Sequence, residues 1–328
     1  MLTRIVTHND FDGIISAALC SMYFSIDRLY FTIPTAVTDK EAPITDTDIL
    51  CDLPYSYECG MWFDHHLGNR EDLKSRGIDI ATIPGCFALK PSCSRVIYDF
   101  LSDRIQWPDY LEQTIQETDI IDSFAYKTPQ EWRRRTPAKL INDTLMIAHV
   151  SKHEGNNYLS DLVKAMRDNP LEDVVRLDWV NEKIERYRHE EKGMIKIIKE
   201  SIYFSDLDHG REVPIIDLTH FKRRPYIVRA LAFTFYPESK AVIVIQNQYR
   251  DGIKLNNLNI SMSLGFYYYN KQHGKDVSAI MSELALGDGH PGAAGGRIRC
   301  SSKQDMLKKK QSTLNEIIKL WQTQPEII

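Results

Sequence analysis

Short apolar runs alternate with helix-like segments in the first half of the chain. Four of these runs predict strands, at residues 2–7, 48–51, 60–63 and 78–83. Two intervening segments have helical character, at residues 13–24 and 92–101. Strands that alternate with helices form mainly parallel sheets covered on both faces. The pattern therefore predicts an α/β N-terminal domain built on a parallel sheet.

The second half begins with long helical patterns and then changes texture. Residues 107–165 read as mostly helical, and 173–201 as one or two helices that lead into the next domain. Further strands are expected at residues 213–218, 226–233, 241–246 and 259–264, and helices at 277–283 and 303–321. This pattern predicts a smaller C-terminal α/β domain. We place the first domain with its linker helix at 1–195 and the second at 201–328, which suits a chain of 328 residues.

Charge and apolar content narrow the range of partners. The chain has 41 Lys+Arg against 45 Asp+Glu, whereas proteins that coat long nucleic acid usually carry a basic surplus. A short anionic substrate held in one local pocket fits this balance better. No secretory signal is visible, and no apolar stretch approaches the roughly 18 residues of a membrane span. We expect a cytoplasmic protein without a membrane partner, for which a homodimer is compatible with the sequence.

The first candidate site is the segment His8-Asn9-Asp10-Phe11-Asp12-Gly13, between the first strand and the first helix. Ligands of open α/β sheets bind at this edge. His8, Asp10 and Asp12 alternate along an extended turn and can point to one side, and such donors suit Mn²⁺, Mg²⁺ or Zn²⁺. A purely structural alternative is that Asp12 caps the helix.

Further acids and histidines follow later strands. Asp52 comes directly after the 48–51 strand, where it could also start a turn with Pro54. The triplet Asp64-His65-His66 follows the next strand, and three adjacent polar groups cannot all face a core. A metal ligand with an orienting partner explains this triplet naturally. In the helical segment ETDIID, two acids three residues apart share one face, which is also common on a solvated helix.

A glycine-rich segment, GDGHPGAAGG at 287–296, precedes two arginines. Its small residues leave backbone N–H groups uncovered, so it can cradle a phosphate as an ordered loop. The alternative is a mobile surface turn. Pro291 and the paired alanines favour the ordered loop.

These motifs, in this order, resemble those of the DHH phosphoesterase family with a DHH-associated C-terminal domain. The matching segments are HNDFDG, DILCDLPY around Asp52, the triplet at 64–66, ETDIID around Asp119 and GDGHPGAAGG. This subtype includes RecJ-type exonucleases, nanoRNase/pAp phosphatases and cyclic dinucleotide phosphodiesterases. The resemblance covers nearly the whole chain, from residue 2 to about 300.

The resemblance implies a site for two metal ions, usually Mn²⁺, with Mg²⁺ or Co²⁺ as substitutes. One ion would take His8, Asp10 and Asp52. The other would take Asp12, Asp52 as a bridge, His65 and Asp119. The first motif is two residues shorter than in the nanoRNase and pyrophosphatase branches, so Asp10 and Asp12 are firmer predictions than His8.

The resemblance also implies catalytic and substrate-binding roles. His66 would stabilise charge on the phosphate, and Asp64 would orient the histidines. The substrate would be held by Gly289, His290, Gly292, Gly295, Gly296 and Arg297. The active site would lie in the cleft between the two domains and accept a nucleotide or short single-stranded nucleic acid.

The predicted function is thus a manganese-dependent phosphoesterase that hydrolyses phosphate esters of nucleotides or short oligonucleotides. One alternative is an inorganic pyrophosphatase or exopolyphosphatase, although the SRK motif of the pyrophosphatase branch is missing here. A catalytically inactive nucleotide-binding scaffold is a second alternative. The full set of candidate ligands disfavours it, because inactive relatives lose such ligands.

Overall fold

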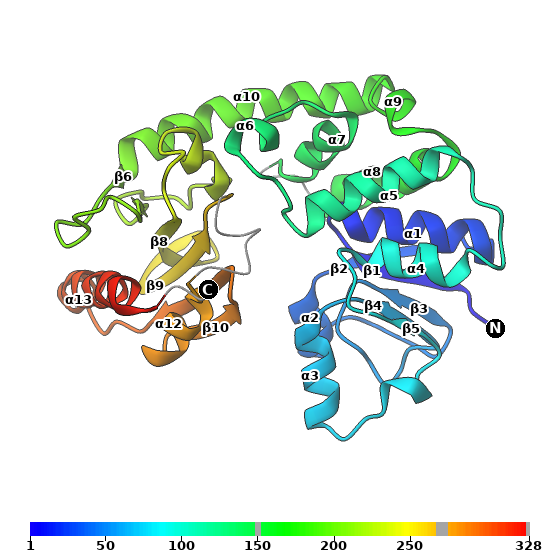
Figure 1. Ribbon diagram of the computed structural model, residues 1–328, viewed down its shortest axis with the longest axis horizontal. Helices are drawn as coiled ribbons and strands as arrows, with labels where there is room; N and C mark the ends of the chain where they lie inside the picture. The colour runs from blue at the N-terminus through cyan, green and yellow to red at the C-terminus, as the bar shows by residue number, and fades with distance from the viewer. Residues whose placement is uncertain (148–151, 267–274, 326–328) are drawn as a thin grey trace. The chain divides into compact units, whose positions relative to one another are not determined.

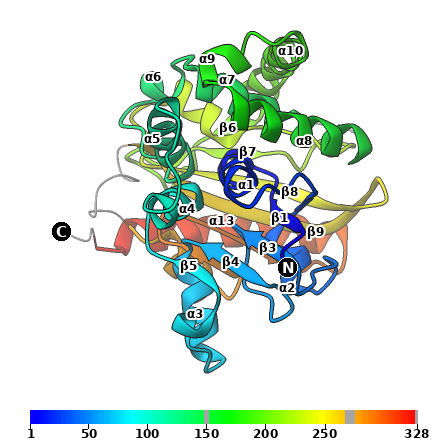
Figure 2. The same ribbon diagram turned by 90° about the vertical axis from the view of Figure 1, so that its right-hand side faces the viewer.

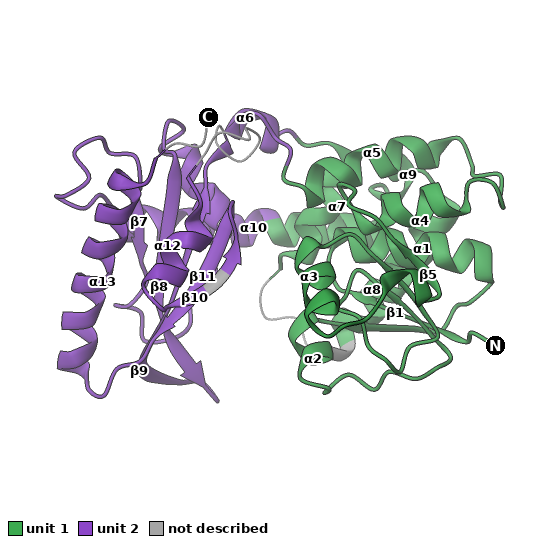
Figure 3. Cartoon of the chain, turned by 60° about the horizontal axis from the view of Figure 1, so that its bottom comes forward, with its two compact units in different colours: residues 1–124, 135–187 green, residues 125–134, 188–328 purple. Residues whose placement is uncertain are grey.

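The computed structural model describes residues 1–147, 152–266 and 275–325. The chain divides into two compact units, coloured separately in Figure 3. Unit 1 comprises residues 1–124 and 135–187, and unit 2 comprises 125–134 and 188–328. The short segment 125–134 therefore leaves unit 1 and belongs with the C-terminal half.

Unit 1 is built on a five-stranded parallel sheet, as the alternating pattern predicted. Its strands are β1 (Arg4–His8), β2 (Leu29–Thr32), β3 (Asp48–Cys51), β4 (Met61–Asp64) and β5 (Gly85–Phe87). They lie in the order β2-β1-β3-β4-β5. β2 lies on one side of β1, and the next strand along the chain, β3, lies on the other side. The strand order therefore reverses here, and the topological switch point lies between β1 and β3. Ligands of open α/β sheets bind at such points.

Both faces of this sheet are covered. Successive strand residues point to opposite faces, and Ile5 and Val6 accordingly belong to two separate hydrophobic cores. Figures 1 and 2 show helices α1 (Phe11–Phe24) and α4 (Cys93–Leu101) on one face. The shorter helices α2 (Pro34–Thr38) and α3 (Leu67–Ser75) cover the other face.

The two segments predicted to be helical, 107–165 and 173–201, are mostly helical where the structure describes them, which leaves out residues 148–151. The helices of this region are α5 (Tyr110–Asp122), α6 (Pro129–Trp132), α7 (Pro137–Leu145), α8 (Lys152–Asp168), α9 (Leu171–Val174) and the long α10 (Asp178–Ser201). Buried residues of α5, α7 and α8 join α1 in the larger core of unit 1. Within the described ranges, no helix is both long and apolar enough to cross a lipid bilayer.

Unit 2 contains a six-stranded mixed sheet in the order β10-β11-β9-β8-β7-β6. The strands are β6 (Ile202–Tyr203), β7 (Ile215–Asp217), β8 (Ala241–Arg250), β9 (Ile253–Leu264), β10 (Gly287–His290) and β11 (Ala293–Ile298). Helices α12 (Val277–Glu283) and α13 (Lys303–Thr323) share a core with β7, β8 and β9. Both helices lie where the sequence predicted them.

Two predicted strands are wrong. Residues 78–83 contain the 3₁₀ turn η1 (Ile80–Thr82), because the Asp79 carboxylate accepts a hydrogen bond from the backbone N–H of Ala81 at 3.0 Å. Residues 226–233 lead into a second 3₁₀ segment, η2 (Arg229–Thr234), whose consecutive apolar side chains are buried. Burial without strand alternation misled the prediction in that second case.

Candidate metal centre

The parallel sheet brings the three N-terminal motifs to one edge. His8 is the last residue of β1, Asp52 directly follows β3, and Asp64 ends β4. Because β1, β3 and β4 are neighbours in the sheet, their carboxyl ends lie side by side. The motifs therefore meet beside the topological switch point.

One group of ligand atoms consists of His8, Asp10 and Asp52, whose atoms lie within 4.8 Å of one another. His8 Nδ1 is 2.7 Å from Asp10 Oδ2 and 3.4 Å from Asp52 Oδ2. Burial opposes the charged imidazolium, but the carboxylates of Asp10 and Asp52 raise the pKa of His8 to about 10. The other oxygen of Asp10 caps α1 by accepting from the backbone N–H of Gly13 at 2.9 Å.

Gly13 is required by a close backbone approach. A Cβ atom at this position would lie 2.2 Å from the carbonyl oxygen of His8. The glycine thus lets α1 begin directly against the end of β1, which places Asp10 and Asp12 at the sheet edge.

A second group consists of Asp12, His65 and Asp122. His65 Nε2 lies 3.3 Å from Asp122 Oδ2 and 3.9 Å from Asp12 Oδ2. Asp12 is 1% exposed, and its two oxygens accept backbone hydrogen bonds from Cys93 at 2.7 Å and Ser94 at 2.8 Å. These N–H groups belong to the first turn of α4, where the helix dipole favours a negative charge.

Asp52 connects these two groups, and it also forms a third group with His65 and His66. Its Oδ2 faces His8, while its Oδ1 lies 3.6 Å from His65 Nε2. Asp52 is 1% exposed and has a left-handed backbone with φ of 56°, which aspartate tolerates better than most residues. Backbone conformations of this kind cluster at functional sites.

Several buried atoms at this centre lack a hydrogen-bond partner among the described residues. Both carboxylate oxygens of Asp52 and Nε2 of His65 are buried without a hydrogen bond to any described residue. Buried polar atoms are normally paired, so such orphans call for an explanation. A metal cation would satisfy all three atoms. The two carboxylate oxygens and the imidazole nitrogen each offer a lone pair of the kind that Mn²⁺, Mg²⁺ or Zn²⁺ binds.

The electrostatics support the same interpretation. Burial and the nearby charge of Asp52 raise the pKa of Asp12 to about 7. Burial, followed by the charges of Asp12 and Asp52, raises the pKa of Asp122 well above its ordinary value. Carboxylates in this arrangement repel one another, and bound cations would remove that repulsion.

Two outer contacts orient the histidines. His65 Nδ1 lies 3.0 Å from the backbone carbonyl of Lys90, so it donates there and leaves Nε2 for a ligand. His66 Nδ1 lies 2.8 Å from Asp64 Oδ1, and Asn69 donates to the other oxygen of Asp64 at 2.7 Å. Asp64 thus holds His66 through a chain of hydrogen bonds, a geometry suited to the orienting role that the resemblance implied.

No protein-family model matches the chain, and no curated protein matches it. Solved structures do match. A pGpG-specific phosphodiesterase from Vibrio cholerae is similar over 98% of this chain and 100% of its own, with a TM-score of 0.74 at 20% identity. A RecJ exonuclease bound to manganese matches over 99% of this chain and 91% of its own, with a TM-score of 0.53 at 11% identity.

The DHH domain of a protein assigned to a family of ribosomal proteins matches over 98% of this chain and 87% of its own, with a TM-score of 0.51 at 10% identity. The similarity to these structures spans both units. The chain has the DHH-type fold. The fold expected from the motifs is thereby confirmed, and the ligand groups occupy the edge of its parallel sheet.

In this chain, Asp119 lies outside the candidate ligand groups. Its Oδ1 accepts from Ser92 Oγ at 2.7 Å, and its Oδ2 lies 2.9 Å from the Arg95 guanidinium. Asp122, one helical turn later, is the carboxylate that reaches His65. Asp122 rather than Asp119 therefore lies beside His65 in the structure, and the metal-binding role expected of Asp119 stays a prediction.

Sequence reasoning also missed the segment Ser92–Ser94. Ser92 caps α4 by accepting from the backbone N–H of Arg95 at 3.1 Å. The next two N–H groups hold the Asp12 carboxylate. The helix-capping pattern of serine before an apolar helix was visible, but its partner about 80 residues earlier was not.

The glycine-rich segment of the DHH-type fold is a β-hairpin rather than an open loop. Strands β10 and β11 pair in antiparallel fashion from Gly287 opposite Gly296 to His290 opposite Ala293. At Gly289, which has a φ of 155°, a Cβ atom would lie 2.5 Å from Cα of Ala294. Close pairing of the two strands explains that glycine. His290 and Arg297 are exposed on the hairpin, and their substrate contacts stay a prediction.

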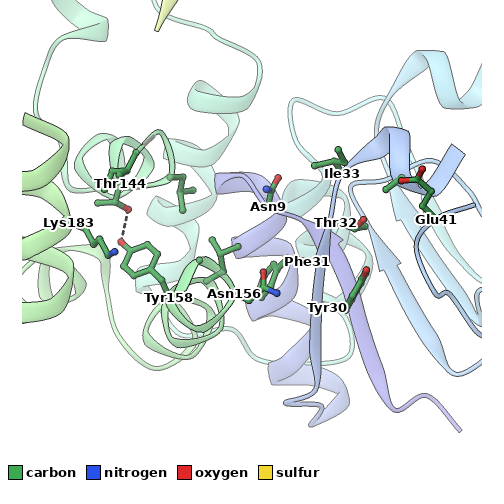
Figure 4. A pocket seen from close by; sticks show the side chains of 15 residues that line it. Asn9, Tyr30, Phe31, Thr32, Ile33, Glu41, Thr144, Asn156, Tyr158 and Lys183 are labelled. Atoms are coloured by element: carbon green, nitrogen blue, oxygen red, sulfur yellow. Dashed lines mark hydrogen bonds between the residues drawn. The ribbon is translucent and has the colours of Figure 1, made fainter. Parts of the chain in front are cut away.

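A pocket of about 550 Å³ opens next to the first motif, within unit 1 (Figure 4). Asn9, between the candidate ligands His8 and Asp10, is on its wall. Amide and aromatic side chains from other elements join it, among them Asn156 and Tyr158. Tyr158 is fixed by a hydrogen bond that its hydroxyl donates to Thr144 at 2.6 Å.

Proposed function

We propose that the protein is a metal-dependent phosphoesterase that hydrolyses phosphate esters of nucleotides or short oligonucleotides. The observation that carries the proposal is Asp52: a buried carboxylate whose oxygens accept no hydrogen bond from a described residue and face His8 on one side and His65 on the other. A structural aspartate would have protein donors at those oxygens. The similarity to a pGpG phosphodiesterase and to RecJ supports the same class of chemistry.

Two cations would bind at this centre. His8 and Asp10 would hold one, Asp12, His65 and Asp122 would hold the other, and Asp52 would serve both. Mn²⁺ is the first candidate, because it accepts mixed nitrogen and oxygen ligands and because a RecJ structure with this fold contains it. When bound, such a cation pair activates water and stabilises charge on a phosphoryl group.

The protein's own residues would orient the metal-binding side chains and stabilise charge on the phosphate. His65 is fixed by the Lys90 carbonyl, and Asp12 by the first turn of α4. Burial opposes the charged form of His66, but its hydrogen bond to Asp64 raises its pKa. When protonated, a form that this bond favours, His66 can donate from Nε2 to a phosphate oxygen, and such preorganised donors stabilise developing charge.

The substrate is proposed to be small. The pocket beside Asn9 has the volume of typical small-ligand sites and offers amide groups and an aromatic ring to a nucleoside. The net charge of −4 does not favour long nucleic acid. Because the solved phosphodiesterase with this fold is specific for pGpG, a diribonucleotide is the first substrate to test.

A substrate screen tests the proposal. Purified protein with Mn²⁺ is incubated with pGpG, pAp, pyrophosphate and an activated phosphodiester, and products are followed by chromatography. We expect hydrolysis of at least one nucleotide, no turnover in chelator, and little turnover by Asp52→Asn. The matched control is Asp103→Asn, an exposed carboxylate of unit 1. Pyrophosphate as the sole substrate, or equal turnover by metal-stripped protein, would contradict the proposal.

A further inference from the structure

Unit 2 contains a hollow that the proposed reaction does not use. It has a volume of about 510 Å³ and is formed by the end of β7, the start of β9, residue Asn247 of β8 and the first turns of α13. Its wall includes His220 and three lysines, Lys254, Lys303 and Lys310. No residue of the metal-ligand groups or of the glycine-rich hairpin lines it.

The wall carries more positive than negative charge, because three lysines line it together with one carboxylate, that of Asp217. Lys310 Nζ lies 2.6 Å from Asp217 Oδ2 and also donates to Thr219 Oγ1 at 2.9 Å. Lys254 Nζ donates to the backbone carbonyl of Thr219 at 2.6 Å. These bonds hold two ammonium groups in defined positions at the wall, so that an anion would meet them already ordered.

The cations also affect one another. Burial, and then the charge of nearby Lys303, lower the pKa of Lys254. A bound anion would reverse that effect, because an opposite charge favours the ammonium form. The hollow is therefore electrostatically suited to a phosphate or carboxylate.

A buried amide supplies a second, independent feature. Asn247 is 2% exposed, and its Nδ2 donates to the backbone carbonyl of Leu255 at 2.8 Å. That bond fixes the amide orientation and leaves Oδ1 as a buried acceptor without a partner among the described residues. A ligand that carries an N–H or O–H group would satisfy it.

We propose that this hollow is a second ligand site, for an organic phosphate of nucleotide size, whose phosphate meets the lysines and whose N–H or O–H donor reaches Asn247. An inorganic phosphate alone would leave most of the volume unfilled, since 510 Å³ lies in the range of small-molecule pockets. Lysines that were merely solvated would explain the charge, but they leave the orphaned Asn247 oxygen unexplained. The inference does not rest on the phosphoesterase activity.

Direct binding tests the site. The Asp52→Asn protein in chelator is titrated calorimetrically with GMP, guanosine and inorganic phosphate, so that the metal centre neither turns over nor binds through cations. We expect saturable GMP binding, with guanosine and phosphate each at least about tenfold weaker because each offers only half of the contacts. The side-chain amide signal of Asn247 in ¹⁵N NMR should shift on addition of GMP.

Matched lysine variants locate the binding. Lys303 is exposed at the first residue of α13, and Lys303→Gln should weaken GMP binding about tenfold through loss of one charge-assisted contact. Lys308→Gln changes the same charge on the same helix outside the hollow and should have no effect. The site is refuted by absent GMP binding, by an unmoved Asn247 signal, or by equal effects of the two variants. Phosphate binding as tight as GMP would overturn the nucleotide-sized ligand.

Discussion

The metal centre and the glycine-rich hairpin were both predicted as functional, but the structure explains them in different ways. At the metal centre, the buried oxygens of Asp52 lie near histidine nitrogens but accept no hydrogen bond from a described residue. At the hairpin, strand pairing itself accounts for Gly289, because no larger residue fits against Ala294. Unsatisfied polar atoms therefore point to a ligand more directly than glycines do, since glycines also serve close backbone packing.

The largest effect is expected at Asp52. Asp52→Asn removes a charge that faces both ligand groups, so it should lower kcat/KM by at least about 10³-fold, equivalent to several kcal/mol of lost transition-state stabilisation. The variant should keep its fold, because Asp52 makes no side-chain hydrogen bond to a described residue. Steady-state kinetics and circular dichroism measure both. Near-normal activity of Asp52→Asn would contradict the claim that the metal centre, unlike the hairpin, is built to bind a ligand.

His66 sharpens the comparison within the metal centre. His66→Ala should lower kcat by about 10²–10³-fold with unchanged metal content, because it removes one donor to the phosphate. His65→Ala should instead reduce metal content, since His65 Nε2 faces Asp12, Asp52 and Asp122. Metal analysis by mass spectrometry alongside kinetics separates the two roles. Equal metal loss in both variants would show that the division is wrong.

The exchange of Asp119 for Asp122 can be tested directly. Asp122→Asn should weaken metal binding by at least about a hundredfold, the upper end of the loss seen when a mere orienting partner of a ligand is removed. Asp119→Asn should have a smaller effect on metal binding, because Asp119 contacts Ser92 and Arg95 instead. Titration calorimetry with Mn²⁺ compares the two. A larger loss in Asp119→Asn would restore the ligand set implied by the resemblance.

This pair also shows where sequence reasoning reached its limit. Strand ends could be predicted from apolar runs, and a parallel sheet necessarily brings its carboxyl ends to one edge, so His8, Asp52 and His65 could be grouped in advance. Asp119 and Asp122 lie on the same helix face, and only the position of the helix against the sheet decides which of them reaches His65. That position depends on long-range packing, including the partnership between Asp12 and the start of α4.

The hairpin was missed for a related reason. Glycine has low strand propensity, so the segment at 287–296 reads as a loop. Its strands form because β9 provides a partner edge for β11, and that pairing is not local in sequence. The four-residue strand β2 was also not predicted, and it too depends on pairing with a strand distant in sequence, β1.

The smallest expected effects concern the hairpin. Gly289→Ala should destabilise the protein by about 1–3 kcal/mol, because alanine is strained at this φ and meets Ala294. Gly295→Ala is the milder comparison, since its Cβ atom would lie 3.3 Å from the carbonyl oxygen of Ile260, a contact that a shift of a few tenths of an ångström relieves. Chemical denaturation measures both. Equal stability of Gly289→Ala and Gly295→Ala would contradict the packing explanation.

His290→Ala should leave stability unchanged and raise KM for a nucleotide if the exposed histidine holds the substrate.

The central claim is that Asp52 joins two cation sites into one centre. Electron paramagnetic resonance of the protein titrated with Mn²⁺ tests it most directly, because two manganese ions that share a carboxylate give an exchange-coupled spectrum. The account predicts that coupled signal at two equivalents of Mn²⁺ in the native protein, and its loss in Asp52→Asn but not in Asp103→Asn. Binding of a single isolated ion by the native protein, or an unchanged coupled spectrum in Asp52→Asn, would contradict the account.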